Sequence, residues 1–133
     1  MASTTEKSLR AHSRWTGSSE VQFKISKLSN RWSSRRHLWR PPPDLYETGQ
    51  AYVVRLEIAG MEKGELNISL EGRSLAVYGV RKLETERASY HQMEVRFGEF
   101  LSLVELPGHV QEESIRAEYN DGFLIVALAK AAS

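Results

Sequence analysis

Apolar and polar residues alternate in several segments after residue 50. Between residues 52 and 58 every second residue is large and apolar, and Arg55 and Glu57 occupy positions between them. A period of two residues is typical of a β-strand with one buried face. Alternation, short apolar runs and turn signals together predict six strands, over residues 52–58, 66–71, 75–80, 100–106, 115–119 and 123–128. No segment keeps a helical period for about 12 residues, so we predict an all-β domain.

The spacing of these strands predicts an antiparallel β-sandwich of about 90 residues. Residues 75–80 and 123–128 are apolar on both faces, so we expect the first to lie centrally and the second to be buried on both faces. The sequence Asn-Asp-Gly at 120–122 accepts positive φ, as a tight hairpin requires. Residues 81–96 are charged and predict a long loop, with a short strand near Tyr90.

Residues 1–40 lack a clear period. Serine and threonine interrupt any apolar stripe, and we expect this segment to be a flexible arm, largely disordered when isolated. The exception is Val21, Phe23 and Ile25, whose alternation with polar residues predicts a short or transient strand. Three prolines at 41–43 favour a stiff extended segment, and we place the end of the arm there.

Charge changes sign at the same boundary. Residues 1–40 carry nine basic and two acidic residues, a local charge of +7, whereas the rest of the chain carries −6 and the net charge is only +1. All three tryptophans lie in the basic part. We therefore predict a basic, Ser- and Arg-rich arm at 1–40, a sandwich domain at 41–130 and a very short tail at 131–133.

Composition excludes several classes of protein. The chain has no cysteine, which removes disulfide scaffolds, thiol nucleophiles and thiolate metal sites. Its four histidines are scattered without metal-binding spacing, and no nucleophile elbow, P-loop or dinucleotide motif is present. We therefore expect no catalytic residue, no cofactor and no metal. No apolar stretch approaches the ~20 residues of a membrane span or forms the core of a signal peptide, so we expect a cytoplasmic protein.

Five motifs follow one another in order along the domain. They are Pro-Asp-Leu-Tyr-Glu at 43–47, Leu-Glu-Ile-Ala-Gly-Met at 56–61, Leu-Ala-Val-Tyr-Gly at 75–79, Phe-Gly-Glu-Phe at 97–100 with Leu-Pro at 106–107, and Ala-Glu-Tyr-Asn-Asp-Gly-Phe-Leu at 117–124. Together they resemble the α-crystallin domain of the small heat-shock protein family, and the last is close to the family's Ala-x-x-x-Asn-Gly-x-Leu hairpin. The resemblance covers roughly residues 41–130 and implies an immunoglobulin-like sandwich.

The resemblance implies an ATP-independent holdase, which binds partly unfolded client proteins and prevents their aggregation under stress. It also implies a dimer, in which a short strand of the long loop, here residues 89–94, pairs with residues 44–46 of the partner. Such an exchange would cover an unpaired sheet edge. The implied dimer-interface residues are Asp44, Leu45, Tyr46, Tyr90, Met93, Glu94 and Arg96.

Client binding is expected at two places. Each large apolar side chain of the arm can contribute roughly 1.5–3 kcal/mol when it is buried on a client. The arm residues expected to do so are Trp15, Phe23, Trp32, Leu38 and Trp39. The resemblance also implies a groove between residues 66–70 and 115–119. Its expected client-binding residues are Leu66, Ile68, Leu70, Ile115 and Ala117.

Two departures from the family pattern bear on assembly. The family's apolar-x-apolar tail motif, which docks in this groove and links dimers, is absent after the last predicted strand. We therefore expect any species larger than a dimer to depend on the arm. The arginine that relatives commonly carry at the place of Ser102 is also missing, so its usual ion pair with Glu94 cannot form, and Arg96 is the alternative partner.

Other functions remain open at this point. The same sandwich class includes co-chaperone-like modules that bind one specific folded partner. A basic arm with tryptophans could bind nucleic acid, because arginine neutralises phosphate and indoles stack on bases, although no motif supports a specific site. The arm also resembles an organellar targeting segment, and its charge could instead hold it against the acidic domain.

Overall fold

The structure is a computed structural model of the 133-residue chain and describes residues 24–25, 38–62, 64–83, 85 and 87–132. The elements in these ranges are β1 (Lys24–Ile25), β2 (Pro43–Glu47), β3 (Ala51–Glu57), β4 (Glu65–Glu71), β5 (Ser74–Arg81), β6 (Gly98–Glu105), the 3-10 turn η1 (Glu112–Ser114), β7 (Arg116–Asn120) and β8 (Phe123–Ala129). All six strands predicted from the sequence are confirmed, and no end differs by more than two residues from the prediction.

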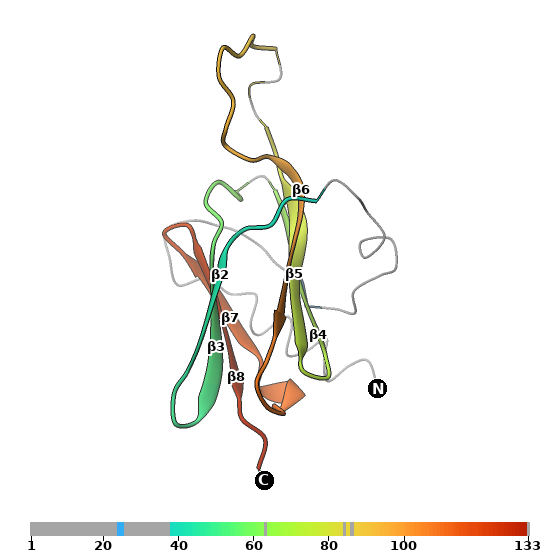
Figure 1. The fold of residues 1–133 in the computed structure, drawn as a ribbon, viewed down its shortest axis with the longest axis vertical. Coiled ribbons are helices and arrows are strands. Elements are labelled where there is room, and N and C mark those ends of the chain that lie inside the picture. Colours follow the sequence, from blue (N-terminus) through green and yellow to red (C-terminus); the bar gives the residue numbers. More distant parts are fainter. Residues whose placement is uncertain (1–23, 26–37, 63, 84, 86, 133) are drawn as a thin grey trace.

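Two four-stranded sheets form a sandwich (Figure 1). The β5 sheet has the strand order β1-β4-β5-β6, and the β8 sheet has the order β2-β3-β8-β7. Neighbouring strands are antiparallel except β1 and β4, which are parallel. The predicted antiparallel sandwich is confirmed, and β5 lies between β4 and β6, as its two apolar faces predicted.

Strand β8 is buried on one face rather than on two. Leu124, Val126 and Leu128 are fully buried, but Phe123 is 37% exposed and Ile125 is half-buried. The prediction of burial on both faces is therefore wrong. The reason is that a sandwich of two layers covers only the inner face of each sheet, and the second apolar face of β8 is the outer one.

The connection between β5 and β6 is a long loop, as predicted, and it projects beyond the sandwich (Figure 1). The short strand predicted near Tyr90 is absent from residues 85 and 87–96 of this single chain. A short strand forms only where a neighbouring strand takes up its backbone hydrogen bonds. Within the described ranges of the chain, no strand pairs with this loop.

A single apolar core fills the space between the two sheets. Its largest fully buried side chains are Tyr119, Phe100, Leu56, Ile58, Met61, Ile68, Leu75, Leu106, Leu124, Leu128 and Val54. The one hydroxyl among them, that of Tyr119, donates a hydrogen bond of 2.9 Å to the Ile58 carbonyl oxygen. Burial raises the pKa of the Tyr119 phenol, and the negative charge of Glu62 acts in the same direction.

Two backbone positions depend on particular residue types. Asp121 and Gly122, which connect β7 to β8, have φ values of 51° and 85°, so the predicted tight hairpin is confirmed. Gly79 lies in β5 beside β4, where a Cβ atom would be only 1.8 Å from the Glu65 carbonyl oxygen. Glycine is therefore required for β4 and β5 to pair at their observed separation.

Candidate functional site

The residues expected to line a groove, on β4 and at the start of β7, belong to the core of the sandwich. The five residues predicted to line it come together in one apolar cluster. Their exposed fractions are 3% for Leu66, 0% for Ile68, 3% for Ile115 and 8% for Ala117, and Leu70 is half-buried. The structure therefore buries these residues in the core of this single chain, and their role in client binding stays a prediction.

Part of the arm belongs to the same core. Strand β1 pairs in parallel with the outer edge of β4, with Lys24 opposite Asn67 and Ile25 opposite Ile68. The Ile25 side chain is only 4% exposed and belongs to the same apolar cluster as the groove residues. Three of the predicted client-binding residues, Trp15, Phe23 and Trp32, lie outside the described residues, and their role stays a prediction.

Two other predicted client-binding residues, Leu38 and Trp39, pack on the β5 sheet. The Trp39 backbone extends the sheet beyond β6, because its N–H donates to the Glu99 carbonyl at 3.2 Å and its carbonyl accepts from the Leu101 N–H at 3.0 Å. The centroid of the Trp39 ring lies 5.6 Å from that of Phe100. Leu38 packs against a small cluster around Tyr78 on the outer face of the same sheet. Residues of the arm thus cover both edges of the β5 sheet.

Ser102 has a role that its sequence position did not reveal. Its side chain is fully buried in β6, and its hydroxyl donates a hydrogen bond of 3.1 Å to the Pro41 carbonyl oxygen. The sequence showed only that a small residue stands where relatives commonly carry arginine. In the structure, the small hydroxyl leaves room for the backbone at Pro41 to pass close to β6.

The predicted dimer-interface residues of β2 lie on an exposed edge. The exposed fractions of Leu45 and Tyr46 are 38% and 43%. The Asp44 carboxylate accepts a hydrogen bond of 2.7 Å from Arg55, which raises the pKa of that guanidinium. The Arg55 guanidinium also lies 5.7 Å from the centroid of the Tyr46 ring. These contacts hold the side chains of β2 against β3, while the backbone edge of β2 faces outward.

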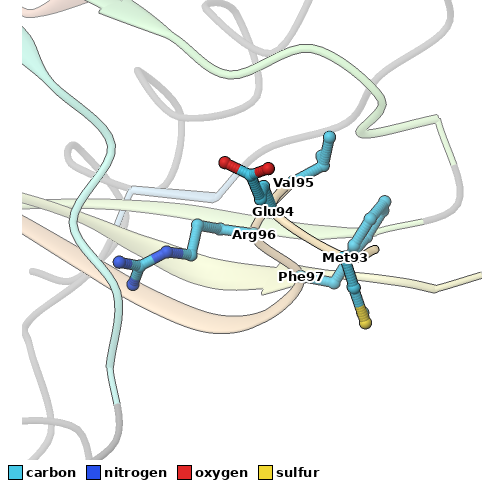
Figure 2. Close-up of a pocket in the computed structure, with 5 residues that line it drawn as sticks. All are labelled: Met93, Glu94, Val95, Arg96 and Phe97. Atoms are coloured by element: carbon cyan, nitrogen blue, oxygen red, sulfur yellow. The ribbon is translucent and has the colours of Figure 1, made fainter. Parts of the chain in front are cut away.

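The predicted dimer-interface residues of the loop are also exposed. The exposed fractions are 46% for Tyr90, 50% for Met93 and 64% for the neighbouring Val95. Residues 93–97 line a concave surface, on which Arg96 extends away from the Glu94 carboxylate (Figure 2). Glu94 accepts a hydrogen bond from Gln92 instead. Arg96 therefore does not replace the missing arginine in an ion pair with Glu94 within this single chain.

The described residues offer little for other kinds of chemistry. No group of three or more His, Asp or Glu side chains within them is arranged to hold a metal ion. Nor does any helix in that part of the chain have the length and apolar character needed to cross a membrane. The features that the structure does present are an exposed strand edge at β2, an exposed loop and an edge of β4 that is paired with the short strand β1.

These features define a two-sheet, largely antiparallel sandwich with a long projecting loop. The sequence model of the Hsp20/alpha crystallin family matches residues 44–133, and the chain belongs to this family. Two solved structures have the same fold at 26% identity. HSP18.5 from E. histolytica has a TM-score of 0.63, and the match covers 71% of this chain and 91% of that protein. The hspA protein from Xanthomonas axonopodis has a TM-score of 0.62, and the match covers 69% of this chain and 94% of that protein.

Relatives in bacteria and plants also match this chain. The chain is 30% identical over 119 residues to the 17.8 kDa class I heat shock protein of Arabidopsis thaliana, covering 87% of this chain and 73% of the relative. It is 26% identical over 92 residues to the small heat shock protein C2 of Rickettsia felis, covering 68% of this chain and 60% of the relative. The match to the 22.0 kDa heat shock protein of Arabidopsis thaliana covers 46% of that protein, so the chain spans about half of its length.

Proposed function

We propose that the protein is an ATP-independent holdase, which binds partly unfolded proteins and keeps them from aggregating. Its family membership supports a chaperone role. The observation that carries the proposal is the pairing of β1 with the edge of β4, because β1 is only two residues long and its Ile25 packs in the apolar cluster that contains Leu66 and Ile68. A short segment of this kind can be released at small cost, and its release uncovers a surface that suits extended apolar chains.

Client capture would then use the arm and the groove together. When β1 leaves β4, Ile25 joins the other apolar residues proposed to bind clients, and the edge of β4 can add a strand from the client. Main-chain hydrogen bonds to a strand edge do not depend on the client's sequence. Apolar side chains such as Leu66 and Ile68 would supply the rest of the binding free energy at about 25 cal/mol per Å² of buried apolar surface.

The exposed patch on β2 and the loop is proposed to join two copies of the chain. In the described part of the chain, β2 has β3 as its only neighbouring strand, so one row of its backbone groups is unpaired. Residues 89–94 of one copy would add a strand to residues 44–46 of the other. This pairing would cover five of the large exposed apolar side chains of the described surface. They are Leu45, Tyr46, Tyr90, Met93 and Val95.

The holdase activity is tested by mixing the full chain with a heat- or reductant-destabilised client, without ATP, and recording light scattering. We expect suppression of scattering at stoichiometric ratios, whereas an equal mass of an inert protein should have no effect. Scattering that proceeds unchanged would contradict the proposal. Binding of one folded partner, with unfolded clients ignored, would favour the co-chaperone-like alternative.

The proposed dimer is tested by comparing Met93→Ser with Leu103→Ser in sedimentation experiments. The two side chains are matched, since their exposed fractions are 50% and 53%, but Leu103 lies on β6 rather than on the loop. We expect Met93→Ser to weaken the dimer by about tenfold, the equivalent of roughly 1.4 kcal/mol. Equal weakening by both substitutions would argue against pairing through the loop.

Assembly beyond the dimer is proposed to require the arm. Light scattering after chromatography would compare the full chain with residues 41–133, which we expect to form dimers only. Residues 38–133 are the matched control, because they keep the backbone pairing between Trp39 and β6. Large particles formed by residues 41–133 alone would contradict this proposal.

A further inference from the structure

Arg81 ties together the two ends of the β5–β6 loop. It is the last residue of β5, and its guanidinium donates to the Arg96 carbonyl oxygen with its Nε at 2.9 Å and also with its Nη2. The Nη1 donates to the Ala59 carbonyl oxygen at 3.2 Å. One side chain therefore links the beginning of the loop, its end and the β3–β4 connection.

Trp39 completes this arrangement from the arm. The Arg81 guanidinium carbon lies 4.5 Å from the centroid of the Trp39 ring and 5.2 Å from that of Phe97. The Trp39 indole N–H donates to the Gly98 carbonyl oxygen at 3.3 Å. Trp39, Arg81, Phe97 and the carbonyls of Arg96 and Gly98 thus form one cluster at the base of the loop, which we name the loop clamp.

The rest of the loop is held by local contacts in its described residues. Thr85 and Tyr90 are hydrogen-bonded to each other, the Ala88 N–H donates to the Thr85 carbonyl, and Gln92 donates to Glu94. None of these contacts reaches either sheet. The direction in which the described loop leaves the sandwich therefore depends on its base, where Arg81 and Trp39 lie.

We propose that Trp39 and Arg81 are positioning residues, which fix the direction of the loop and couple it to the docking of the arm on β6. A planar guanidinium can stack on two aromatic rings while its edge donates to two carbonyls, and a lysine ammonium cannot do both. The consequence for pairing between copies rests on the function proposed above, because residues 89–94 must leave the sandwich in a defined direction to reach β2 of a partner.

The test uses the full chain, whose lack of cysteine allows specific labelling. Nitroxides at Arg87→Cys on the loop and Glu71→Cys at the end of β4 report the distance distribution between the two sites, with labelled chains diluted in unlabelled ones. We expect Arg81→Lys and Trp39→Phe each to broaden the distribution about twofold. Arg73→Lys is the matched control, because Arg73 donates to the Pro107 carbonyl and pairs with Glu105 without contacting the loop.

The outcomes separate a positioning role from a purely structural one. Broadening in Arg81→Lys with an unchanged urea midpoint supports the proposal. An unchanged distribution, or the same broadening in Arg73→Lys, would overturn it. If Trp39→Phe or Arg81→Lys lowers the urea midpoint strongly, the variant and the wild type are compared under conditions in which the same fraction of each is folded. The distance distribution of the folded chains then tests the proposal.

Sedimentation of the same variants distinguishes this proposal from the proposed dimer. We expect Arg81→Lys to raise the dimer dissociation constant about tenfold, since a loop with no fixed direction must be ordered on pairing. If the wild-type chain is monomeric, the proposed pairing through the loop is wrong. The positioning role of the loop clamp would still be tested by the distance distribution. A released loop with an unchanged dissociation constant would overturn the coupling between the clamp and the dimer.

Discussion

Ile25 of the arm lies opposite Ile68 of β4, in parallel register, and both side chains are buried in the same core. The exposed fractions are 4% for Ile25 and 0% for Ile68. Part of the arm is therefore a structural element of the sandwich. This relationship also makes Ile25 the residue whose removal should uncover the groove.

Ile25→Ser is expected to release β1 from β4. Removing a buried Ile side chain and placing a hydroxyl near the core should lower the free energy of unfolding by about 2 kcal/mol. The loss cannot be larger than the free energy that holds β1 on β4, because the strand then detaches. The uncovered groove should bind more of a hydrophobic dye and suppress client aggregation at lower concentration. Urea unfolding, dye fluorescence and light scattering measure these three effects.

Leu103→Ser is the control for that substitution. Leu103 is a large apolar residue of the same sheet, but it is 53% exposed, so its replacement should change neither stability nor dye binding appreciably. If Ile25→Ser lowers stability without raising dye binding, the groove is not opened by loss of β1.

Gly79→Ala is expected to be one of the most destabilising small substitutions in the chain. The new Cβ would lie 1.8 Å from the Glu65 carbonyl oxygen, so β4 and β5 would have to separate at the centre of their sheet. We expect a loss of roughly 3 kcal/mol or more in urea unfolding. Gly49→Ala is the matched control, because no atom lies within 4 Å of its Cβ position and stability should be kept.

Tyr119→Phe should cost about 1 kcal/mol, because it removes the hydrogen bond to the Ile58 carbonyl and leaves that buried oxygen without its phenol donor. The effect should depend on pH in the alkaline range. Burial raises the pKa of the phenol above its usual value of about 10, so the folded state keeps the proton more tightly than the unfolded state.

The pH dependence has a definite sign. The contribution of Tyr119 is fully present below about pH 10 and is lost as the pH rises through the folded-state pKa. The stability difference between the wild type and Tyr119→Phe should therefore shrink above pH 10, in urea unfolding measured at several pH values. A difference that grows with pH would contradict the assignment of the shift to burial of the neutral phenol.

Ser102→Ala should lower the free energy of unfolding by about 1 kcal/mol, because the Pro41 carbonyl oxygen loses its donor in a buried site. Ser102→Arg should act differently, since its long side chain does not fit the space between β6 and Pro41. We expect it to displace Trp39 from β6. Fluorescence in a Trp15→Phe, Trp32→Phe background would report this as a red shift, and Ser102→Ala should show no such shift.

The strands of the sandwich were predictable because the signal for each is local. A period of two along residues 52–58 predicts an extended backbone without reference to the rest of the chain. In the same way, Asp121 and Gly122 predict a tight hairpin. The exposed side chains of β2 and the loop followed from the family resemblance. Their placement on the surface agrees with the expected interface, but pairing with a partner stays a prediction.

The contacts of the arm could not be predicted in the same way. The alternation that includes Ile25 predicts a strand but not its neighbour, since pairing depends on which sheet edge is open. Trp39 and Leu38 were expected to bind clients because they are large apolar residues in a basic segment, yet the same property suits them to pack on β6 and around Tyr78. Ser102 was noted only for the arginine that it replaces, because its partner is a backbone carbonyl distant in sequence.

The two arm segments that pair with the edges of the β5 sheet, β1 and Trp39, precede all the other strands of the sandwich in the chain. During synthesis from the N-terminus they are made first, whereas β4 and β6 follow later and the core is complete only with β8. β1 has no edge to pair with until β4 has been made, and Trp39 has none until β6 has been made. We therefore expect the arm to dock only after its partner strands have been made, so that a newly made chain presents Ile25 and Trp39 to its surroundings until then.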